Sequence, residues 1–502
     1  MMNISLKGLS ILRETKALLL PVFEKEGIHG ESYPSNLKEV LEKKAARKPF
    51  EGKKDTLSLL SFYEEELPET LILVGLGKKE DFSLETLSSS LAKGFQKAKS
   101  EKASSLTLDL TVLEELFPFE KILPVVGKTF TLANYEFVKY QKEKEGENEK
   151  KSKEVLQDVF LFSKDEEQLL LLESLLAEGI HEGLSTCIAR DLVNEPANVI
   201  NPDSLAKVAQ HQGEIFGFSV TVKNEKEIED LGMEALLTVG RGSNNPPKLI
   251  VMKYHGNGDS DEVYGLIGKG LTYDSGGYSL KPTDGMLTMK MDMGGSAAVI
   301  GAMAAIAKQG LKVNVTAVVA ACENMISGDA FRPGDVIGSM AGKTIEVTNT
   351  DAEGRLTLAD AVTYAIEKEG ATKIIDIATL TGAALVAMGK DITPYLSTDD
   401  DMSRDLEKAS ENALEKVWRL PAEKSYLDLL KSDIADIKNS GPRLAGTITA
   451  GLFVQSFAKD VPWMHLDIAG TAWTDKKKDL CPIGGTGSGA SLLYHYFKLL
   501  SQ

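Results

Sequence analysis

The sequence has few cysteines, no long hydrophobic run and too few basic residues to balance its acids. Three cysteines in 502 residues, Cys187, Cys322 and Cys481, are too few and too scattered for a disulfide framework or a cysteine-based zinc site. No run of about 20 apolar residues occurs, so no transmembrane helix is predicted. Residues 1–27 interrupt their apolar stretches with Lys, Arg and Glu, unlike a signal peptide. These absences predict a protein of the reducing cytoplasm.

The charge balance and the histidines exclude further classes of function. Lys+Arg 57 against Asp+Glu 74 leaves a formal net charge of −17, which disfavours a polyanionic partner such as nucleic acid. The 6 histidines are scattered and form no H-E-x-x-H motif, so a histidine-based metalloprotease site is not indicated. We therefore expect neither a nucleic acid nor a membrane as a partner.

Length and residue pattern predict an α/β protein of two domains. A single core rarely extends beyond about 250–300 residues. Strand-like segments at residues 70–77 and 104–110 flank a helix-like segment at 84–101. We predict two domains, each a mostly parallel or mixed sheet flanked by helices: an N-terminal α/β domain at residues 1–165, for regulation or assembly, and a larger catalytic domain at residues 166–502.

The alternation of strands and helices resumes in the second domain. Predicted strands lie at residues 263–268, 313–322, 343–348 and 373–380, and predicted helices at residues 295–310 and 356–369. Strands separated by helices favour a largely parallel sheet covered on both faces. In such sheets ligands bind beyond the carboxyl ends of the strands.

Acidic residues gather at these predicted strand ends. "NTDAEGRL" (residues 349–356), called the octapeptide below, follows the strand at 343–348, and in an extended chain every second side chain from Asn349 to Arg355 would project toward one region. Upstream, a glycine-rich stretch offers Lys269, Asp274, Lys281 and Asp292. Carboxylates brought so close together need cations. Either the basic side chains supply them in a salt-bridge network, or divalent metals do, and two bridged metals are common in hydrolytic sites.

These segments resemble the leucyl aminopeptidase (cytosol aminopeptidase) family of di-metal exopeptidases. The resemblance covers residues 189–497 and is carried by "KGLTYDSGG", "SLKP", "MDMGG", "NTDAEGRL", "ENMISGDAFRPGDV", "ATLTGA" and "HLDIAGTAW". It implies a metal-dependent enzyme of intracellular peptide turnover that removes N-terminal residues, preferably leucine and other apolar ones, from short peptides. It also implies a homohexamer built as two stacked trimers.

The resemblance assigns roles to individual residues. The implied ligands of two divalent ions, Mn²⁺ or Zn²⁺, are Lys269, Asp274, Asp292, Asp351 and Glu353. Of these, Asp274, Asp351 and Glu353 would hold the tighter ion, and Lys269, Asp274, Asp292 and Glu353 the more exchangeable one. Lys281 would contact the substrate carbonyl, and Arg355 would hold a bicarbonate that acts as general base. The implied substrate pocket comprises Met289, Thr379, Gly382, Ala469 and Ala472.

Two other classes of function are weighed against the aminopeptidase. A di-metal phosphoesterase on a similar scaffold commonly recruits histidines, which the acidic segments lack, and the octapeptide favours the peptidase. A DNA-binding or scaffolding role, known for some members of the family, is weakened by the charge of −17. Ala472 is smaller than the residue that some members carry, which bears on the preference for leucine.

Overall fold

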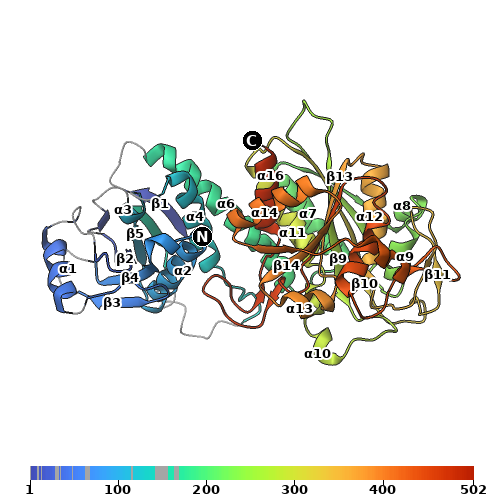
Figure 1. The fold of residues 1–502 in the computed structure, drawn as a ribbon, viewed down its shortest axis with the longest axis horizontal. Helices are drawn as coiled ribbons and strands as arrows, with labels where there is room; N and C mark the ends of the chain where they lie inside the picture. The colour runs from blue at the N-terminus through green and yellow to red at the C-terminus, as the bar shows by residue number, and fades with distance from the viewer. Residues whose placement is uncertain are drawn as a thin grey trace. The chain divides into compact units, whose positions relative to one another are not determined.

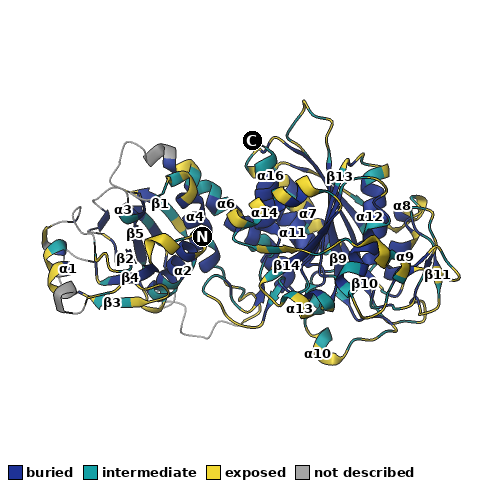
Figure 2. Ribbon diagram, in the orientation of Figure 1, coloured by how far each residue is buried: buried dark blue, intermediate teal, exposed yellow. Residues whose placement is uncertain are grey.

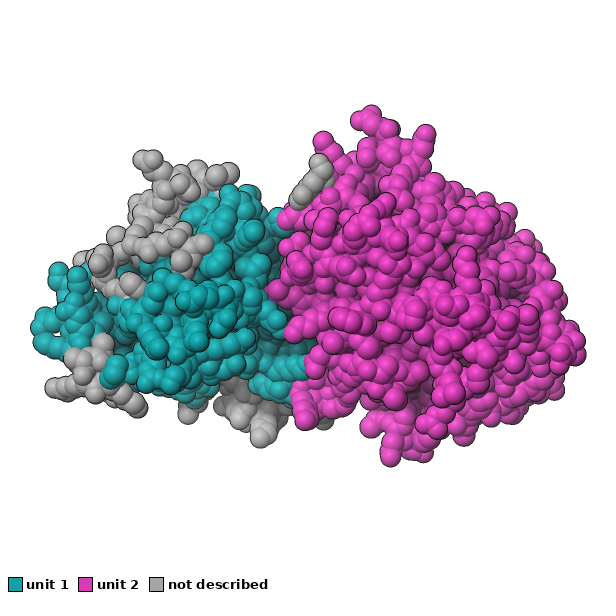
Figure 3. All heavy atoms as spheres, viewed as in Figure 1, with its two compact units in different colours: residues 1–184, 477–482 teal, residues 185–476, 483–502 magenta. Residues whose placement is uncertain are grey.

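The structure is a computed structural model that describes residues 2–501 apart from 8–10, 13, 29–32, 34, 48, 63–67, 115–116, 142–155 and 163–168. The chain divides into two compact units, Met1–Leu184 with Lys477–Pro482 and Ser185–Lys476 with Ile483–Gln502 (Figure 3). Helix α6 (Leu169–Asn194) runs from the first unit into the second. The domain boundary predicted between residues 165 and 166 lies outside the described residues.

The first unit contains a six-stranded sheet (Figure 1). In sheet order its strands are β1 (Asn3–Lys7), β6 (Asp158–Phe162), β5 (Ser105–Asp109), β2 (Ala17–Phe23), β4 (Thr70–Gly77) and β3 (Leu57–Ser61). All neighbours are parallel except β3 and β4. The helices are α1 (Ser35–Arg47), η2 (Lys79–Asp81), α2 (Leu84–Ser100), α3 (Thr111–Glu114) and α4 (Phe119–Ala133). The elements predicted as β4, α2 and β5 are confirmed to within a residue at each end.

The second unit is built on an eight-stranded mixed sheet. In sheet order its strands are β15 (Lys416–Arg419), β14 (Ile392–Ser397), β17 (Trp463–Asp467), β13 (Lys373–Ala378), β9 (Tyr264–Asp274), β10 (Asn314–Asn324), β8 (Lys248–His255) and β7 (Ser219–Lys223). The central strands β17, β13, β9 and β10 are parallel, whereas β14 and β8 run antiparallel to them. The carboxyl ends of the central strands therefore meet at one edge of the sheet.

Helices cover both faces of this sheet, and the central strands are buried between them (Figure 2). The helices of this unit are α7 (Pro202–Phe216), α8 (Glu225–Asp230), α9 (Glu234–Gly240), α10 (Thr283–Met286), η3 (Met289–Met291), α11 (Gly294–Lys308), α12 (Gly354–Glu367), α13 (Gly382–Met388), α14 (Asp400–Ala413), η4 (Lys424–Leu430), α15 (Gly446–Gln455) and α16 (Ala490–Leu500). Alternate residues of β10 face two separate cores. Val315, Ala317 and Val319 pack with α7, α11, α14 and α16, and Val318 and Ala320 pack with α9, α12 and α15.

The strand predicted at residues 343–348 is wrong in extent and in place. Only Ile345–Glu346 (β12) pairs, and it does so in a separate three-stranded sheet with β11 (Val336–Ile337) and β16 (Ile437–Lys438). The flanking residues have other partners: Thr344 N donates to Asp436 Oδ2 at 2.8 Å, and Val347 N donates to Asp335 O at 2.8 Å. A further pair is formed by β18 (Trp473–Thr474) and β19 (Gly484–Gly485).

Membrane-spanning helices and the cysteines are considered in the described residues alone. None of the helices in this part of the chain combines the length and the apolar character needed to cross a membrane. The three cysteines are free thiols, and two of them, Cys322 and Cys481, are buried.

Candidate metal centre

Strand β9 carries two of the predicted site residues, Lys269 near its middle and Asp274 at its end. A regular strand would point residues five apart to opposite faces. The pairing of β9 with β10 shifts register after Leu271, so Thr272 is the extra residue of a β-bulge. The bulge returns Asp274 to the face of the sheet that Lys269 occupies, and both side chains are buried there.

The octapeptide is not extended, contrary to the prediction. Thr350 and Asp351 form a turn, and Glu353 has helical backbone angles (φ −75°, ψ −37°) as the N-cap of α12. The turn is closed by the side chain of Asn349, whose Oδ1 accepts a hydrogen bond from Asp351 N at 2.9 Å. Arg355 therefore lies in the first turn of α12 rather than in line with the two acids.

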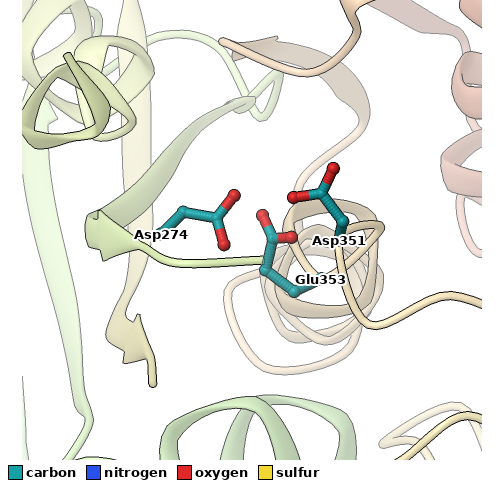
Figure 4. A group of neighbouring side chains, drawn as sticks. All are labelled: Asp274, Asp351 and Glu353. Atoms are coloured by element: carbon teal, nitrogen blue, oxygen red, sulfur yellow. The ribbon is translucent and has the colours of Figure 1, made fainter. Parts of the chain in front are cut away.

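Three carboxylates from these two segments converge (Figure 4). One oxygen atom each of Asp274, Asp351 and Glu353 lies within 4.8 Å of the other two. Asp292, between η3 and α11, joins this group through Lys269, whose Nζ lies 2.8 Å from Asp292 Oδ2 and 3.1 Å from Glu353 Oε1. The structure thus brings all five predicted ligands into one cluster.

Lys281 pairs with different acids of the cluster than Lys269 does. Its Nζ is 2.7 Å from Asp274 Oδ2 and 2.5 Å from Asp351 Oδ1. Burial disfavours the ammonium form of both lysines, but the surrounding carboxylates outweigh burial and raise the pKa of each. In the ion-free chain the two lysines therefore carry protons and supply the compensating charge.

The acids are perturbed in the directions that crowding predicts. Burial is the largest cause of the raised pKa values of Asp292, to about 7, and Asp274, to about 6, and the neighbouring carboxylates add to it. Burial also opposes ionisation of Glu353, but Lys269 and Lys281 outweigh it and lower its pKa. The cluster is short of positive charge without added cations.

Unsatisfied oxygen atoms test whether divalent ions fit this cluster. Within the described part of the chain, Glu353 Oε2, Asp292 Oδ2 and Asp351 Oδ1 are buried and accept no hydrogen bond of good geometry, although the last two lie at ion-pair distance from lysines. Buried acceptors without partners are costly. Carboxylate oxygens are ligands that Mn²⁺ and Zn²⁺ accept. The donor set therefore fits divalent metal ions.

Arg355 is a buried cation beside the cluster. Its Nη1 donates to Asn439 O at 2.9 Å, whereas Nε is buried without a hydrogen-bond partner in the described residues. Burial lowers the pKa of the guanidinium to about 10, so it stays protonated at neutral pH. A buried guanidinium with a free N–H is suited to a small anion.

The predicted pocket residues are only partly brought together. Thr379 Oγ1 donates to Asp292 Oδ1 at 2.7 Å, and Thr379 O accepts from Lys269 Nζ at 3.0 Å. A Cβ on Gly294 would lie 3.2 Å from Thr379 Cγ2 and 3.4 Å from Ala472 Cβ, so these two residues meet at the start of α11.

The remaining three predicted pocket residues lie in the loop after β17, at the start of α13 and in η3. Ala469 N donates to Asp467 Oδ1 at 3.1 Å, and Thr381 Oγ1 donates to Asp467 Oδ2 at 2.6 Å, so this buried carboxylate ties Ala469 to the loop after β13. Gly382 is exposed at the start of α13, and Met289 is half-buried in η3.

Sequence reasoning missed three buried residues that support the cluster, namely Asp467, Asn324 and Asn439. Asn324 Nδ2 donates to Asp274 Oδ1 at 2.8 Å and to Thr350 O at 3.0 Å, and Asn439 binds both the octapeptide and Arg355. Asp467 and Asn324 lie inside segments that carry the family resemblance, and that position could have indicated them. Asn439 lies in none of these segments.

Comparisons with known proteins relate the chain to one family. The model of the cytosol aminopeptidase family, catalytic domain, matches residues 187–494, and the model of its N-terminal domain matches residues 19–144. A curated relative from Clostridium perfringens, named "Probable cytosol aminopeptidase", is 48% identical over 96% of this chain and 96% of its own length.

Solved structures give the same result for the fold. The bottromycin maturation enzyme BotP in complex with Mn superposes with a TM-score of 0.85 at 30% identity, over 97% of this chain and 100% of that chain. A variant of tomato leucine aminopeptidase superposes with a TM-score of 0.84 at 32% identity, over 99% of this chain and 97% of that chain.

Proposed function

Since the chain belongs to the cytosol aminopeptidase family and is on that ground an aminopeptidase, we propose that it removes N-terminal residues, preferably leucine and other apolar ones, from short peptides in intracellular peptide turnover. The proposal places the protein in the cytoplasm. The observation that carries it is the buried cluster of acids and lysines with unsatisfied carboxylate oxygens.

Two divalent ions, Mn²⁺ or Zn²⁺, would be held by this cluster. Asp274, Asp351 and Glu353 would bind the tighter ion, which their convergence within 4.8 Å supports. Lys269 and Asp292 would join Asp274 and Glu353 around the more exchangeable one. Lys269 must lose its proton to act as a ligand, so uptake of this ion should release protons. When bound, such ions supply Lewis acidity and lower the pKa of a coordinated water.

Lys281 is proposed to act on the substrate carbonyl. Its ammonium group lies beside Asp274 and Asp351 and is less buried than Lys269. From this place the ammonium would donate a hydrogen bond to the carbonyl oxygen of the peptide. A fixed cation there stabilises the developing oxyanion more than the ground state.

Arg355 is proposed to hold a bicarbonate that acts as general base. The free Nε–H of its buried guanidinium supports this role. The planar guanidinium can donate two parallel hydrogen bonds to such an anion. The side chain of the substrate would enter a pocket formed by the predicted residues Met289, Thr379, Gly382, Ala469 and Ala472.

The proposed assembly is a homohexamer of two stacked trimers. In the second unit, α13 and the segment before α15 expose three large apolar side chains: Leu385 at 38%, Val386 at 88% and Leu444 at 80%. A Cβ on Gly446 would lie 3.0 Å from Ala383 Cβ, so these segments are neighbours. An exposed apolar patch of this kind supports a contact between subunits. Light scattering should give a mass near six times 54.4 kDa, and a fully active monomer would contradict the hexamer.

The test of the activity compares peptides that differ only at the amino end. The protein is dialysed against chelator, reloaded with Mn²⁺, Zn²⁺ or Mg²⁺, and assayed on dipeptides with varied first residues, each free or N-acetylated. We expect release of the first residue from the free peptides, fastest for leucine, and none from the acetylated ones. Equal turnover of both sets would exclude an aminopeptidase.

A further inference from the structure

One buried asparagine binds the loop that carries Asp351. Asn439 follows β16 and its side chain is fully buried. Its Oδ1 accepts hydrogen bonds from Thr348 N at 2.9 Å and Asn349 N at 3.3 Å, and its Nδ2 donates to Asn349 O at 2.7 Å and Ala352 O at 3.4 Å. Since backbone N–H groups face Oδ1 and backbone carbonyls face Nδ2, these partners fix the orientation of the side-chain amide.

The backbone of Asn439 extends this network to both ends of the loop. Its N–H donates to Glu346 O at 2.9 Å, which joins it to β12. Its carbonyl accepts from Arg355 Nη1 at 2.9 Å, which joins it to the first turn of α12. One residue thus contacts the strand before the loop, the loop itself and the arginine that follows it.

The loop is also held at Thr350, whose carbonyl accepts from Asn324 Nδ2 at 3.0 Å and whose N–H donates to Ser279 Oγ at 3.2 Å. Residues 347–352 belong to no helix or strand, so their backbone groups have no regular ladder of partners. Asp351 N bonds to Asn349 Oδ1 at 2.9 Å, and Asn349 is the residue whose N–H and carbonyl both bond to the Asn439 side chain. Asn439 therefore acts on the orientation of Asp351 through a single intermediate residue, Asn349.

We propose that Asn439 is a positioning residue that sets Asp351 and Arg355 in their working arrangement. It acts on Asp351 through Asn349 and on the Arg355 guanidinium through its own backbone carbonyl. The inference rests on the proposed function, which gives Asp351 its role as a metal ligand and Arg355 its role as an anion holder. Partners that orient metal ligands typically change metal affinity or activity by about 10- to 100-fold when they are removed.

The experiment compares two variants of Asn439 with a matched asparagine. Asn439→Asp keeps the acceptor and loses the donor, whereas Asn439→Ala loses both. Asn314 is the control, because it is also buried and also clamps a loop, with Nδ2 donating to Asn257 O at 2.8 Å and Ser260 O at 2.9 Å. It begins β10, at the end of the strand away from the cluster.

Four quantities are measured on full-length, chelator-dialysed protein: Mn²⁺ affinity by calorimetry, the bicarbonate concentration for half-maximal activation, KM for a leucyl peptide, and the melting temperature. Both Asn439 variants should bind the tighter Mn²⁺ about 10- to 100-fold more weakly, with KM unchanged. They should also need more bicarbonate, because without the side-chain bonds the backbone carbonyl that accepts from Arg355 is no longer fixed. Asn314→Ala should lower the melting temperature alone. If Asn439→Ala does not fold, Asn439→Asp decides.

The outcomes separate this inference from the function on which it rests. Wild-type affinity and bicarbonate response in the Asn439 variants, with a melting temperature lowered as in Asn314→Ala, would reduce Asn439 to a structural residue and overturn the inference alone. A wild-type protein that binds no Mn²⁺ would overturn the proposed function and the inference with it.

Discussion

Replacing Gly354 by alanine should displace Lys269 while leaving the fold intact. Gly354 is the first residue of α12, and an added Cβ would lie 2.3 Å from Lys269 Cε and 2.6 Å from Lys269 Nζ. No real Cβ tolerates such contacts, so the lysine must move. It would leave Asp292 and Glu353, to which its Nζ now lies 2.8 and 3.1 Å away.

The expected loss of stability is small and the expected loss of metal affinity is large. Overpacking a core typically costs about 1–3 kcal/mol, and the better helix propensity of alanine returns up to about 1 kcal/mol. Net destabilisation should therefore be roughly 0–3 kcal/mol. Moving Lys269 away from the exchangeable site should weaken the binding of that ion. The expected loss of affinity is at least the roughly 10- to 100-fold that the loss of an orienting partner produces.

Calorimetric titration with Mn²⁺ and urea denaturation measure the two effects. Gly382→Ala is the control for both, because Gly382 is also the first residue of a helix and an added Cβ there meets nothing within 4 Å. The control should bind both ions as the wild type does. Two ions bound with wild-type affinity in Gly354→Ala would refute Lys269 as a ligand.

Three further predictions concern the charged side chains around the cluster. Lys281→Ala should lower kcat by about 10²–10³-fold, as loss of an oxyanion donor typically does; an unchanged kcat in a steady-state assay would exclude the role. Arg355→Ala should lower activity less and abolish activation by bicarbonate, and a wild-type bicarbonate titration in this variant would show that the anion binds elsewhere. Burial raises the pKa of Asp292 to about 7 in the folded, ion-free chain, so the folded state binds its proton more tightly than the unfolded state and this group's contribution to stability falls as pH rises from about 4 to 7. Urea denaturation in chelator should therefore show wild type losing stability relative to Asp292→Asn over that range, and a difference that does not vary with pH would contradict it.

Local pattern was sufficient to predict several regular elements of the fold. The apolar run of β4 and the helical period of α2 are local signals, and both elements lie where the sequence predicts them. The small, apolar helix α11 was also predicted, at residues 295–310 against an observed Gly294–Lys308. These elements depend on neighbouring residues, so a single sequence reveals them.

The shape of the site could not be predicted because it depends on distant residues. The period-two argument places Asp351 and Glu353 on one side of an extended chain, but they converge because a turn and the start of α12 intervene. That turn is bound by Asn439, about 90 residues further along the chain. The bulge at Thr272, which brings Asp274 to the face of Lys269, likewise arises from pairing with β10 and has no local signature. Residue types and the family resemblance thus predicted the members of the cluster, whereas tertiary contacts decide how they meet.

Metal-dependent release of leucine is the measurement that tests the central claim most directly. Wild type, Glu353→Gln and Asp360→Asn are dialysed against chelator, reloaded with Mn²⁺, and analysed for bound metal and for leucine released from a leucyl dipeptide. Asp360 is a fully buried acid on α12 outside the cluster, whose carboxylate accepts from Leu236 N and Met340 N. We expect wild type and Asp360→Asn to bind two ions and release leucine only when reloaded, and Glu353→Gln to lose both properties. Two ions and full activity in Glu353→Gln, or release of leucine by wild type in chelator, would contradict the account.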